Sequence, residues 1–514
     1  MQQQESRVRK SLLNARVNLI FYFLTLALSF FSRKIFLDTL GADFVGLTTT
    51  LSNLLGFLNL AELGIGGAIG YVLYKPLFNH DETKINEIIS VFGFLYSRIG
   101  FIILGAGVVL GCFLPLIFPG TAFEMGIIYF AYSSFLASSL IGYFANYKQT
   151  LLGADQKNYV VTAYFQSATI VKTLIQMASA YYTGSYYLWV TIELTFGIIY
   201  SFILNWKIRK VYPWLRSEIR EGRKLFKKYP EVMRYTKQLF VHKIGGFVQF
   251  QTIPFLTYAF VSLKIVAYYG NYTIIIDKLA TFVGNFLEST GAGVGNLIAE
   301  GNKGKIQSVF WELFAIRFWV ASIVTFAVYM LVSPFIVLWL GEEYVLSNII
   351  LILILIRSFM GIIRGATDQF LFGFGLFYDT WAPITETVIF IIVAIIGGYF
   401  WGLAGILLGG VVSLITIVGI WKPYFLFSKG FKQSVWSYWY NCMVYVILCI
   451  IPAIVTCFVL YEIFPAGYAS QSWGAWIIYS CVLTFTNAVL CCISLYVGTR
   501  GMRSFVGRIL KMKK

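Results

Sequence analysis

Residues 388–412 read VIFIIVAIIGGYFWGLAGILLGGVV, a run without a single charged side chain. A helix needs about 20 apolar residues to cross a hydrocarbon layer of about 30 Å, and comparable runs recur along nearly the whole chain. Of the 514 residues, 58% are hydrophobic and only 12% are charged, against about 25% charged in soluble domains. A soluble core cannot bury that much apolar surface, so the sequence predicts an all-α integral membrane protein.

The apolar runs predict about fourteen transmembrane helices in two lobes. The expected helices are 14–36, 44–73, 87–114, 125–147, 158–181, 186–206, 236–260, 266–297, 309–338, 346–372, 381–400, 402–421, 435–460 and 473–498. We therefore expect a six-helix lobe at 1–206, a basic cytoplasmic linker at 207–235, a second six-helix lobe at 236–421, and two further helices with a basic tail at 422–514.

Basic residues are concentrated in alternate connections. One set includes the amino terminus, the 207–235 linker and the carboxyl-terminal tail, whereas the opposite set has few cations beyond Arg33, Lys34 and Lys264. Basic loops translocate poorly and stay cytoplasmic, so both termini are expected in the cytoplasm. The formal net charge of +17 then reflects contact with anionic membrane lipids. No folded basic surface remains for nucleic acid.

Cysteine and histidine usage argues against an enzyme or a metal protein. The seven cysteines form no CxxC pair, and the two histidines, His80 and His242, have no neighbouring cluster of metal ligands. We expect no metal, no cofactor and no disulfide framework. Membrane enzymes generally gather acids, bases or histidines in a sizeable extramembrane loop, and the expected outer loops are short. The sequence therefore favours a protein that is not an enzyme.

A weak internal repeat supports the two-lobe interpretation. The segment Asn59–Glu62 followed by Gly67 resembles the segment Asn285–Glu288 followed by Gly293, each in the expected second helix of its half. Because the first and seventh helices both start inside, such a repeat would be parallel, with its pseudo-two-fold axis along the membrane normal.

Six short motifs, all in the first 160 residues, point to a family. They are NARVN (14–18), SRKIFLDTLG (32–41), VGL (45–47), ELGIG (62–66), LYKPL (73–77) and LLGADQK (151–157). Together they resemble the polysaccharide repeat-unit flippases, of O-antigen type, in the multidrug/oligosaccharidyl-lipid/polysaccharide (MOP) exporter superfamily. Beyond residue 160 the resemblance is mostly topological.

The resemblance implies two six-helix lobes that open alternately to either side of the membrane, plus two extra carboxyl-terminal helices. It implies that the cargo is an undecaprenyl-pyrophosphate-linked oligosaccharide, carried to the outer leaflet of a bacterial inner membrane for lipopolysaccharide or related surface polysaccharide. The implied partners are membrane lipids, a polysaccharide polymerase and chain-length machinery.

Polar residues form stripes along several expected helices, at spacings of three and four residues. Such a face is costly against lipid, so the stripes predict a hydrated cavity between the lobes. Ordinary polar packing between helices is the alternative. The candidate cavity-lining residues are Asn18, Thr25, Gln176, His242, Gln249 and Asn285.

Charged residues inside expected spans normally face a partner or water. Arg98, Lys172, Arg317 and Arg357 have no obvious carboxylate on their own helix face. Because a guanidinium can bind a diphosphate with two parallel hydrogen bonds, we expect these four, with Arg33 near the outer mouth, to line the pyrophosphate path.

Salt bridges to Glu62, Glu193 or Glu288 are the alternative for the buried cations, and an interfacial anchor is the alternative for Arg33. Arg364 and Asp368, four residues apart, are expected to form a local pair. Buried carboxylates can exchange their charge with an ion. Glu62, Asp277 and Glu288 are therefore candidates for coupling to H⁺ or Na⁺.

A multidrug antiporter is the main rival function, since that branch of the superfamily shares the two-lobe plan. The resemblance implies that such exporters stop at twelve helices and favour acidic cavities for cationic drugs. Two extra helices after Trp436 and the buried arginines favour an anionic, lipid-linked cargo instead. A channel would have one polar pore and no lobed repeats, so the sequence fits a channel less well.

Overall fold

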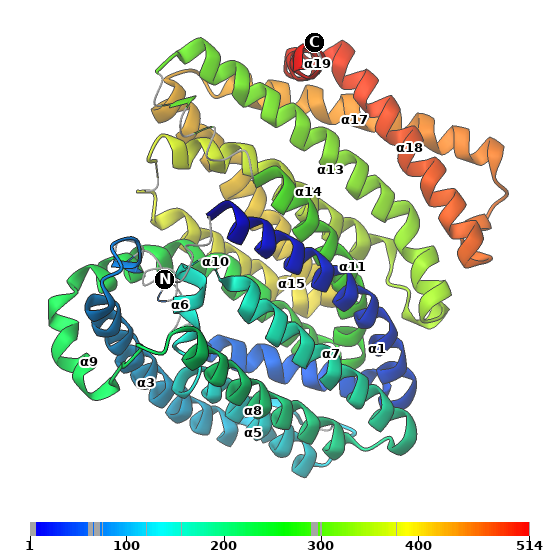
Figure 1. The fold of residues 1–514 in the computed structure, drawn as a ribbon. Coiled ribbons are helices and arrows are strands. Elements are labelled where there is room, and N and C mark those ends of the chain that lie inside the picture. The colour runs from blue at the N-terminus through cyan, green and yellow to red at the C-terminus, as the bar shows by residue number, and fades with distance from the viewer. Residues whose placement is uncertain are drawn as a thin grey trace. The chain divides into compact units, whose positions relative to one another are not determined.

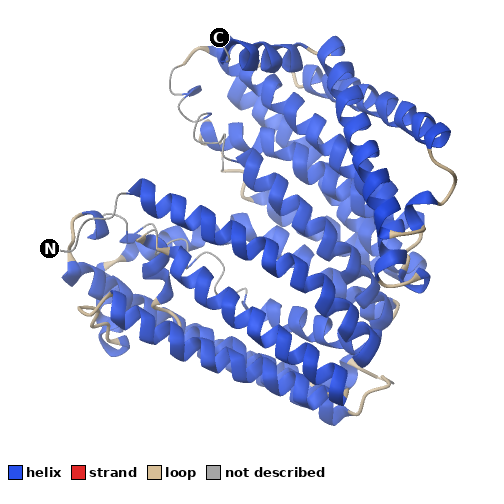
Figure 2. Cartoon of the chain, turned by 45° about the vertical axis from the view of Figure 1, so that its right-hand side comes forward, coloured by secondary structure: helices blue, strands red, loops and turns tan. Residues whose placement is uncertain are grey.

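The computed structural model describes residues 7–59, 65, 72–73, 76–119, 121–155, 157–288, 294, 297–298, 301–376 and 378–512. Every regular element among these residues is a helix (Figure 2). Twelve of the helices are at least 20 residues long, and two of those bend sharply, so they provide fourteen long helical segments. The all-α class and the expected number of helices are confirmed.

The two bends occur at glycines. α1 (Arg7–Leu58) bends at Gly41, with φ 85° and ψ 158°, and α15 (Trp381–Leu414) bends at Gly402, with φ 55° and ψ −133°. Positive φ is strained for a residue that carries a Cβ atom, so glycine permits both bends. Each bend falls where the sequence predicts one helix to end and the next to begin, so α1 and α15 each supply two of the expected helices.

Contacts divide the chain into two compact units, Met1–Ala267 and Tyr268–Lys514. In the first unit α1 packs on α7, α7 on α8, α8 on α5, and α5 on α3 (Figure 1). Its core includes Phe44, Leu47, Phe92 and Ile128, which are at most 1% exposed. The remaining helices of this unit are α3 (Glu82–Cys112), α4 (Leu114–Ile117), α5 (Met125–Phe144), α6 (Gln149–Ala154), α7 (Asn158–Thr183), α8 (Tyr186–Val211), α9 (Ile219–Leu225), η2 (Phe226–Lys228) and α10 (Pro230–Phe260).

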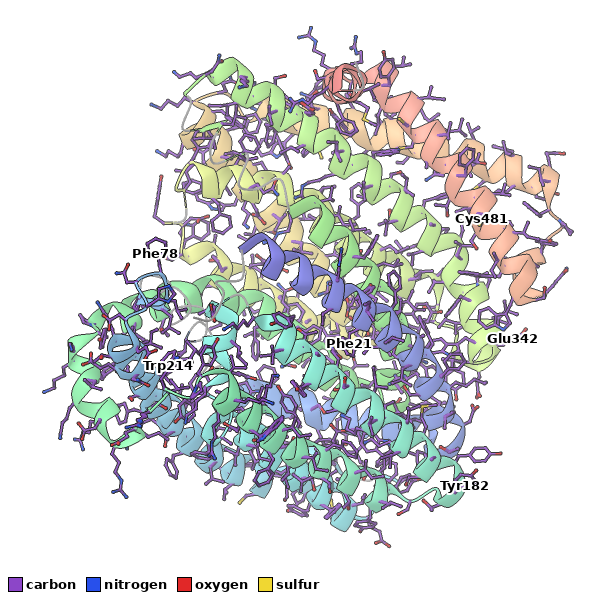
Figure 3. All side chains as sticks on the ribbon, in the orientation of Figure 1. Phe21, Phe78, Tyr182, Trp214, Glu342 and Cys481 are labelled. Carbon is purple, nitrogen blue, oxygen red and sulfur yellow. The ribbon has the colours of Figure 1, made fainter. Side chains whose placement is uncertain are left out.

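The segment expected to be a linker is folded against α3. Asn86 Oδ1 accepts a hydrogen bond from the main-chain nitrogen of Arg216 at 2.7 Å, and Ser90 Oγ accepts one from the main-chain nitrogen of Glu218 at 2.9 Å. Trp214, labelled in Figure 3, lies in this segment. α10, which the sequence places in the second lobe, packs on α1 of the first unit. The lobe boundaries drawn from the sequence stay a prediction.

The second unit is organised around α13 (Lys303–Trp339), which packs against α14, α17, α18 and α19. Phe310, Phe314 and Phe318 recur every four residues along α13 and are fully buried, so one face of the helix forms the core. The other elements are most of α11 (Leu263–Glu288), then η3 (Glu342–Tyr344), α14 (Asn348–Gly373), α15, η4 (Ile415–Trp421), α16 (Lys422–Phe425), η5 (Leu426–Phe431), α17 (Trp436–Ile463), η6 (Tyr468–Ser470), α18 (Trp473–Gly498) and α19 (Arg500–Met512).

Within the described residues, nine helices are long and apolar enough to cross a membrane. Two of these nine, Ile20–Leu58 and Trp381–Phe431, contain the glycine bends. Large side chains such as Phe202, Phe458 and Phe485 are more than two-thirds exposed on these helices, as expected of surfaces that face lipid. The chain is therefore a multi-pass membrane protein.

Three further long helices, α7, α10 and α11, are not among the nine apolar ones. They carry Gln176 and Gln249, two of the candidate cavity-lining residues, and Asp277, a candidate for ion coupling. Helices of this kind are too polar to be surrounded by lipid and need protein or water on part of their surface.

Candidate functional site

The five cations predicted to bind substrate occupy different surroundings. Arg98 lies exposed on α3, with its guanidinium 5.5 Å from the centre of the Phe94 ring. Arg33 on α1 is half-buried and donates a hydrogen bond from Nη2 to the main-chain oxygen of Ala267 at 2.8 Å. This hydrogen bond links α1 to the start of α11, which is a structural role for Arg33.

Lys172 is bound to a carboxylate of the neighbouring helix. Its Nζ lies 2.6 Å from Glu193 Oε1 on α8, and the two side chains are 19% and 27% exposed. Gln176, only 2% exposed, donates a hydrogen bond to the other carboxylate oxygen at 3.0 Å and a second one to the Trp189 main-chain oxygen at 3.2 Å. Lys172 therefore forms a salt bridge, the alternative predicted for the buried cations, with Glu193 as its partner.

Arg317 is enclosed in the core of the second unit. It is 4% exposed on α13 and donates hydrogen bonds to the main-chain oxygens of Ile362 at 3.1 Å and Leu287 at 3.4 Å. Gly365 makes room for it, because a Cβ atom there would lie 2.1 Å from Nη1. These contacts join α13 to α11 and α14, which is a packing role.

Arg357 differs from the other four cations. It lies half-buried in the middle of α14, and its Nε is buried without a hydrogen-bond partner among the described residues. The guanidinium donates a hydrogen bond to the hydroxyl of Tyr269 and interacts electrostatically with Asp277, both on α11. Asp277 is exposed on that helix. The pair therefore offers one cation with free hydrogen-bonding capacity beside one accessible carboxylate.

The local pair expected on α14 is confirmed and belongs to a larger network. Arg364 Nε lies 2.9 Å from Asp368 Oδ2, and Lys422 Nζ lies 2.6 Å from Asp368 Oδ1. Arg364 also interacts electrostatically with Glu386 on α15. Two cations and two carboxylates neutralise one another here, so this network stabilises the second unit and leaves no excess charge for a ligand.

Another ion pair of the second unit has no counterpart in the sequence predictions. Glu312 on α13 is only 5% exposed and lies 2.7 Å from Arg508 of α19, whose side chain is 57% exposed. The two residues are 196 positions apart, and no spacing rule connects residues so distant.

The predicted cavity-lining and ion-coupling residues are only partly described. Thr25 donates its hydroxyl to the Phe21 main-chain oxygen of its own helix at 2.7 Å, and Gln249 on α10 is buried. The remaining ones, Asn18, Glu62, His242, Asn285 and Glu288, have side chains outside the described residues. The cavity between the two lobes stays a prediction.

An open groove lies in the first unit, between α5, α7 and α8. Its volume is about 600 Å³, and apolar and aromatic side chains line it together with hydroxyl and amide groups, Lys172 and Glu193. Of this lining, the sequence predicted only Lys172 as a site residue, on the pyrophosphate path. Among the described residues no group of three or more histidine, cysteine or acidic side chains could hold a metal ion.

The arrangement of helices is similar to that in solved structures of a lipid flippase and of a multidrug transporter. A structure of the lipid II flippase MurJ in an inward closed conformation matches with a TM-score of 0.62 and 14% sequence identity, over 93% of this chain and 98% of that chain.

A multidrug resistance transporter of the MATE family is also similar. Its inward-facing form matches with a TM-score of 0.60 at 14% identity, over 80% of this chain and 97% of that chain. An outward-facing structure of a multidrug resistance MATE family transporter matches with a TM-score of 0.53 at 13% identity, over 80% of this chain and 94% of that chain. Neither a protein-family model nor a curated protein matches the sequence. The likeness therefore concerns the fold.

Proposed function

We propose that this chain is an alternating-access transporter and not an enzyme. Its cargo is an undecaprenyl-pyrophosphate-linked oligosaccharide repeat unit, moved from the cytoplasmic to the outer leaflet of a bacterial inner membrane for cell-surface polysaccharide. The fold supports this proposal, because a flippase of lipid II has the same arrangement of helices. Both termini then lie in the cytoplasm, and the product supplies a polysaccharide polymerase and its chain-length machinery.

The observation that carries the choice of an anionic cargo is the state of Arg357. A buried guanidinium nitrogen without a partner costs free energy, and a diphosphate oxygen is the acceptor that a planar guanidinium binds best. Arg33, Lys172 and Arg317 already hold acceptors within their own units. Arg98 is exposed on α3, so Arg357 is the one buried cation of the five that has a guanidinium nitrogen, Nε, open to a ligand.

Of the three candidates for ion coupling, Asp277 is the one whose side chain lies among the described residues. It shares the surroundings of Arg357, and a cargo diphosphate that binds the guanidinium would weaken the attraction between the two side chains. The carboxylate would then be available to H⁺ or Na⁺. This sequence of events links cargo binding to ion binding through one arginine, and it makes no use of a metal or an organic cofactor.

An ion-coupled multidrug antiporter is the second candidate. It is favoured by the similarity to the MATE transporter and by the exposed carboxylate of Asp277, because a cationic drug would bind a carboxylate. The two candidates make opposite demands on the same pair: the flippase needs the charge of Arg357, whereas the antiporter needs the charge of Asp277.

Deleting the gene from its bacterium separates the two functions. We expect the deletion strain to lose surface polysaccharide and to accumulate lipid-linked repeat units, and we expect its drug susceptibility to stay unchanged. Polysaccharide is measured by electrophoresis of cell extracts, lipid-linked units by mass spectrometry, and susceptibility by growth inhibition. The flippase proposal fails if surface polysaccharide is normal and susceptibility to cationic drugs rises.

A further inference from the structure

The short helix α19 follows directly on α18 and turns away from it. Thr499, between the two helices, has an extended main chain with φ −129° and ψ 142°. Figure 1 shows α19 nearly end-on, whereas α18 and α13 run across the view. Because α18 is long and apolar enough to cross a membrane, α19 begins where that span ends. A helix that turns aside at this point lies along the membrane surface.

The sequence of α19 separates cationic from apolar side chains. A helix turns by about 100° per residue, which places the two kinds of residue on opposite sides. The cationic residues are Arg500, Arg503, Arg508 and Lys511, and the apolar ones are Met502, Phe505, Val506 and Ile509. No aspartate or glutamate follows Glu462 in the sequence, so this segment has no carboxylate of its own to neutralise the cations. The pattern is typical of helices that lie among lipid head groups.

The apolar side of α19 is fixed to the second unit. Met502 is 1% exposed and belongs to the core built around α13. Gly501 lies so close to α13 that a Cβ atom there would be 2.2 Å from the Trp311 main-chain oxygen. The ion pair between Arg508 and Glu312, at 2.7 Å, is a second attachment. These contacts hold α19 in one orientation relative to α13.

The opposite side of α19 presents guanidinium groups that are free to bind an anion. Arg500, Arg503 and Ser504 are all exposed. Arg503 donates Nε to the Thr499 main-chain oxygen at 3.1 Å, which fixes the direction of its guanidinium. Among the described residues, neither Arg500 nor Arg503 has a carboxylate partner. Ser504 and Gly507 lie between the cations along this side, and their small size leaves room for a ligand.

We propose that the exposed side of α19 binds the phosphate of an anionic phospholipid, with Arg500 and Arg503 as the donors. Guanidinium groups bind phosphate oxygens with paired hydrogen bonds. Lipid phosphates also occupy the plane to which the end of α18 brings this helix, whereas an acidic protein would have to be recruited there. The inference is independent of the proposed function, because this lipid is bound at the surface and is not transported.

Titration of the purified full-length protein in detergent tests this site, with phosphatidylglycerol and phosphatidylcholine of the same acyl chains as probes. Native mass spectrometry counts the lipids bound at each concentration. We expect phosphatidylglycerol to bind more tightly than phosphatidylcholine, because only the former has a net negative charge. A ligand that binds the folded state alone raises the midpoint of thermal unfolding, so we expect phosphatidylglycerol to raise it as well.

Arg500→Gln and Arg503→Gln should each weaken binding of phosphatidylglycerol about fivefold, and the double variant about thirtyfold. The matched control is Arg220→Gln, which removes an exposed arginine of α9 in the first unit and should bind as the parent protein does. Replacing both residues by lysine keeps the charge and should preserve most of the binding, even if the glutamine variants fold poorly. Arg508 is left in place, because its loss would leave the buried carboxylate of Glu312 without a cation.

The proposal is overturned if phosphatidylcholine binds as tightly as phosphatidylglycerol, or if the folded double glutamine variant binds phosphatidylglycerol as the parent protein does. An equal loss of binding in Arg220→Gln would also overturn it, because the lipid would then respond to the overall basic charge and not to α19. Tighter binding of polyglutamate than of phosphatidylglycerol would identify an acidic protein as the partner. Failure to transport lipid-linked oligosaccharide, with phosphatidylglycerol binding intact, would contradict the proposed function and leave this site standing.

Discussion

Replacing Arg357 by glutamine should lower the rate of lipid-linked oligosaccharide flipping at least about tenfold while the protein folds and accumulates normally. The substitution removes a cation whose Nε has no partner among the described residues, and glutamine keeps an amide that can donate a hydrogen bond to the Tyr269 hydroxyl. A charge-assisted hydrogen bond contributes roughly 1.5–3 kcal/mol, and 1.4 kcal/mol corresponds to about a factor of ten. Surface polysaccharide and protein abundance, measured in the same cells, check this expectation.

Arg357→Lys should show an intermediate rate, because lysine keeps the charge and loses the planar pair of donors. The matched control is Arg98→Gln, which removes an exposed arginine that lies over the Phe94 ring, and we expect it to behave as the parent protein does. Full transport by Arg357→Gln would remove this residue from the cargo path.

Replacing Arg317 by alanine should instead destabilise the protein by about 2–4 kcal/mol. The change empties a buried volume between α11, α13 and α14 and deprives the Ile362 carbonyl of a donor, and both effects are costly in a packed core. The Leu287 carbonyl keeps a hydrogen bond from Gln369 Nε2 at 3.3 Å. Thermal unfolding of the purified protein should show a lower midpoint by several degrees.

Gly365→Ala should also lower the midpoint of thermal unfolding, because the added Cβ atom would collide with the Arg317 guanidinium. Arg98→Ala should shift the midpoint of thermal unfolding no more than an ordinary surface substitution does. If Arg317→Ala unfolds at the parent temperature but transports nothing, Arg317 belongs to the cargo path and its packing role is wrong.

The helices of this protein were predictable because the signal for them is local. Apolar runs of about 20 residues mark a membrane helix, and the interruptions near residues 41 and 401 coincide with the bends at Gly41 and Gly402. The Arg364–Asp368 pair was predictable for the same reason, since four residues make about one helical turn.

The partners of the other charged residues could not be predicted, because they come from different helices. Glu193 is 21 residues from Lys172, Lys422 is 54 from Asp368, and Arg508 is 196 from Glu312. Arg317 binds main-chain oxygens, which every residue has and no sequence pattern reveals. The identity of each pair depends on packing.

The predicted site changes accordingly. Arg33, Lys172 and Arg317 support the fold of their units, Arg98 is exposed beside Phe94, and Arg357 with Asp277 becomes the centre of the proposed transport mechanism. The groove of the first unit was not predicted, because its lining comes from α5, α6, α7 and α8 and from the loop that contains Asn146. Each of these contributes only a few polar residues to it.

Flipping by the purified protein in liposomes tests the central claim most directly. The vesicles contain a labelled polyprenyl-diphosphate-linked oligosaccharide, and an added glycosidase that cannot enter them reports how fast the sugar reaches the outside. We expect the parent protein to speed this exposure, Arg357→Gln to slow it at least about tenfold, and a cationic dye to be left in place. Movement of the dye without movement of the labelled lipid would identify a multidrug transporter and refute a lipid-linked, anionic cargo.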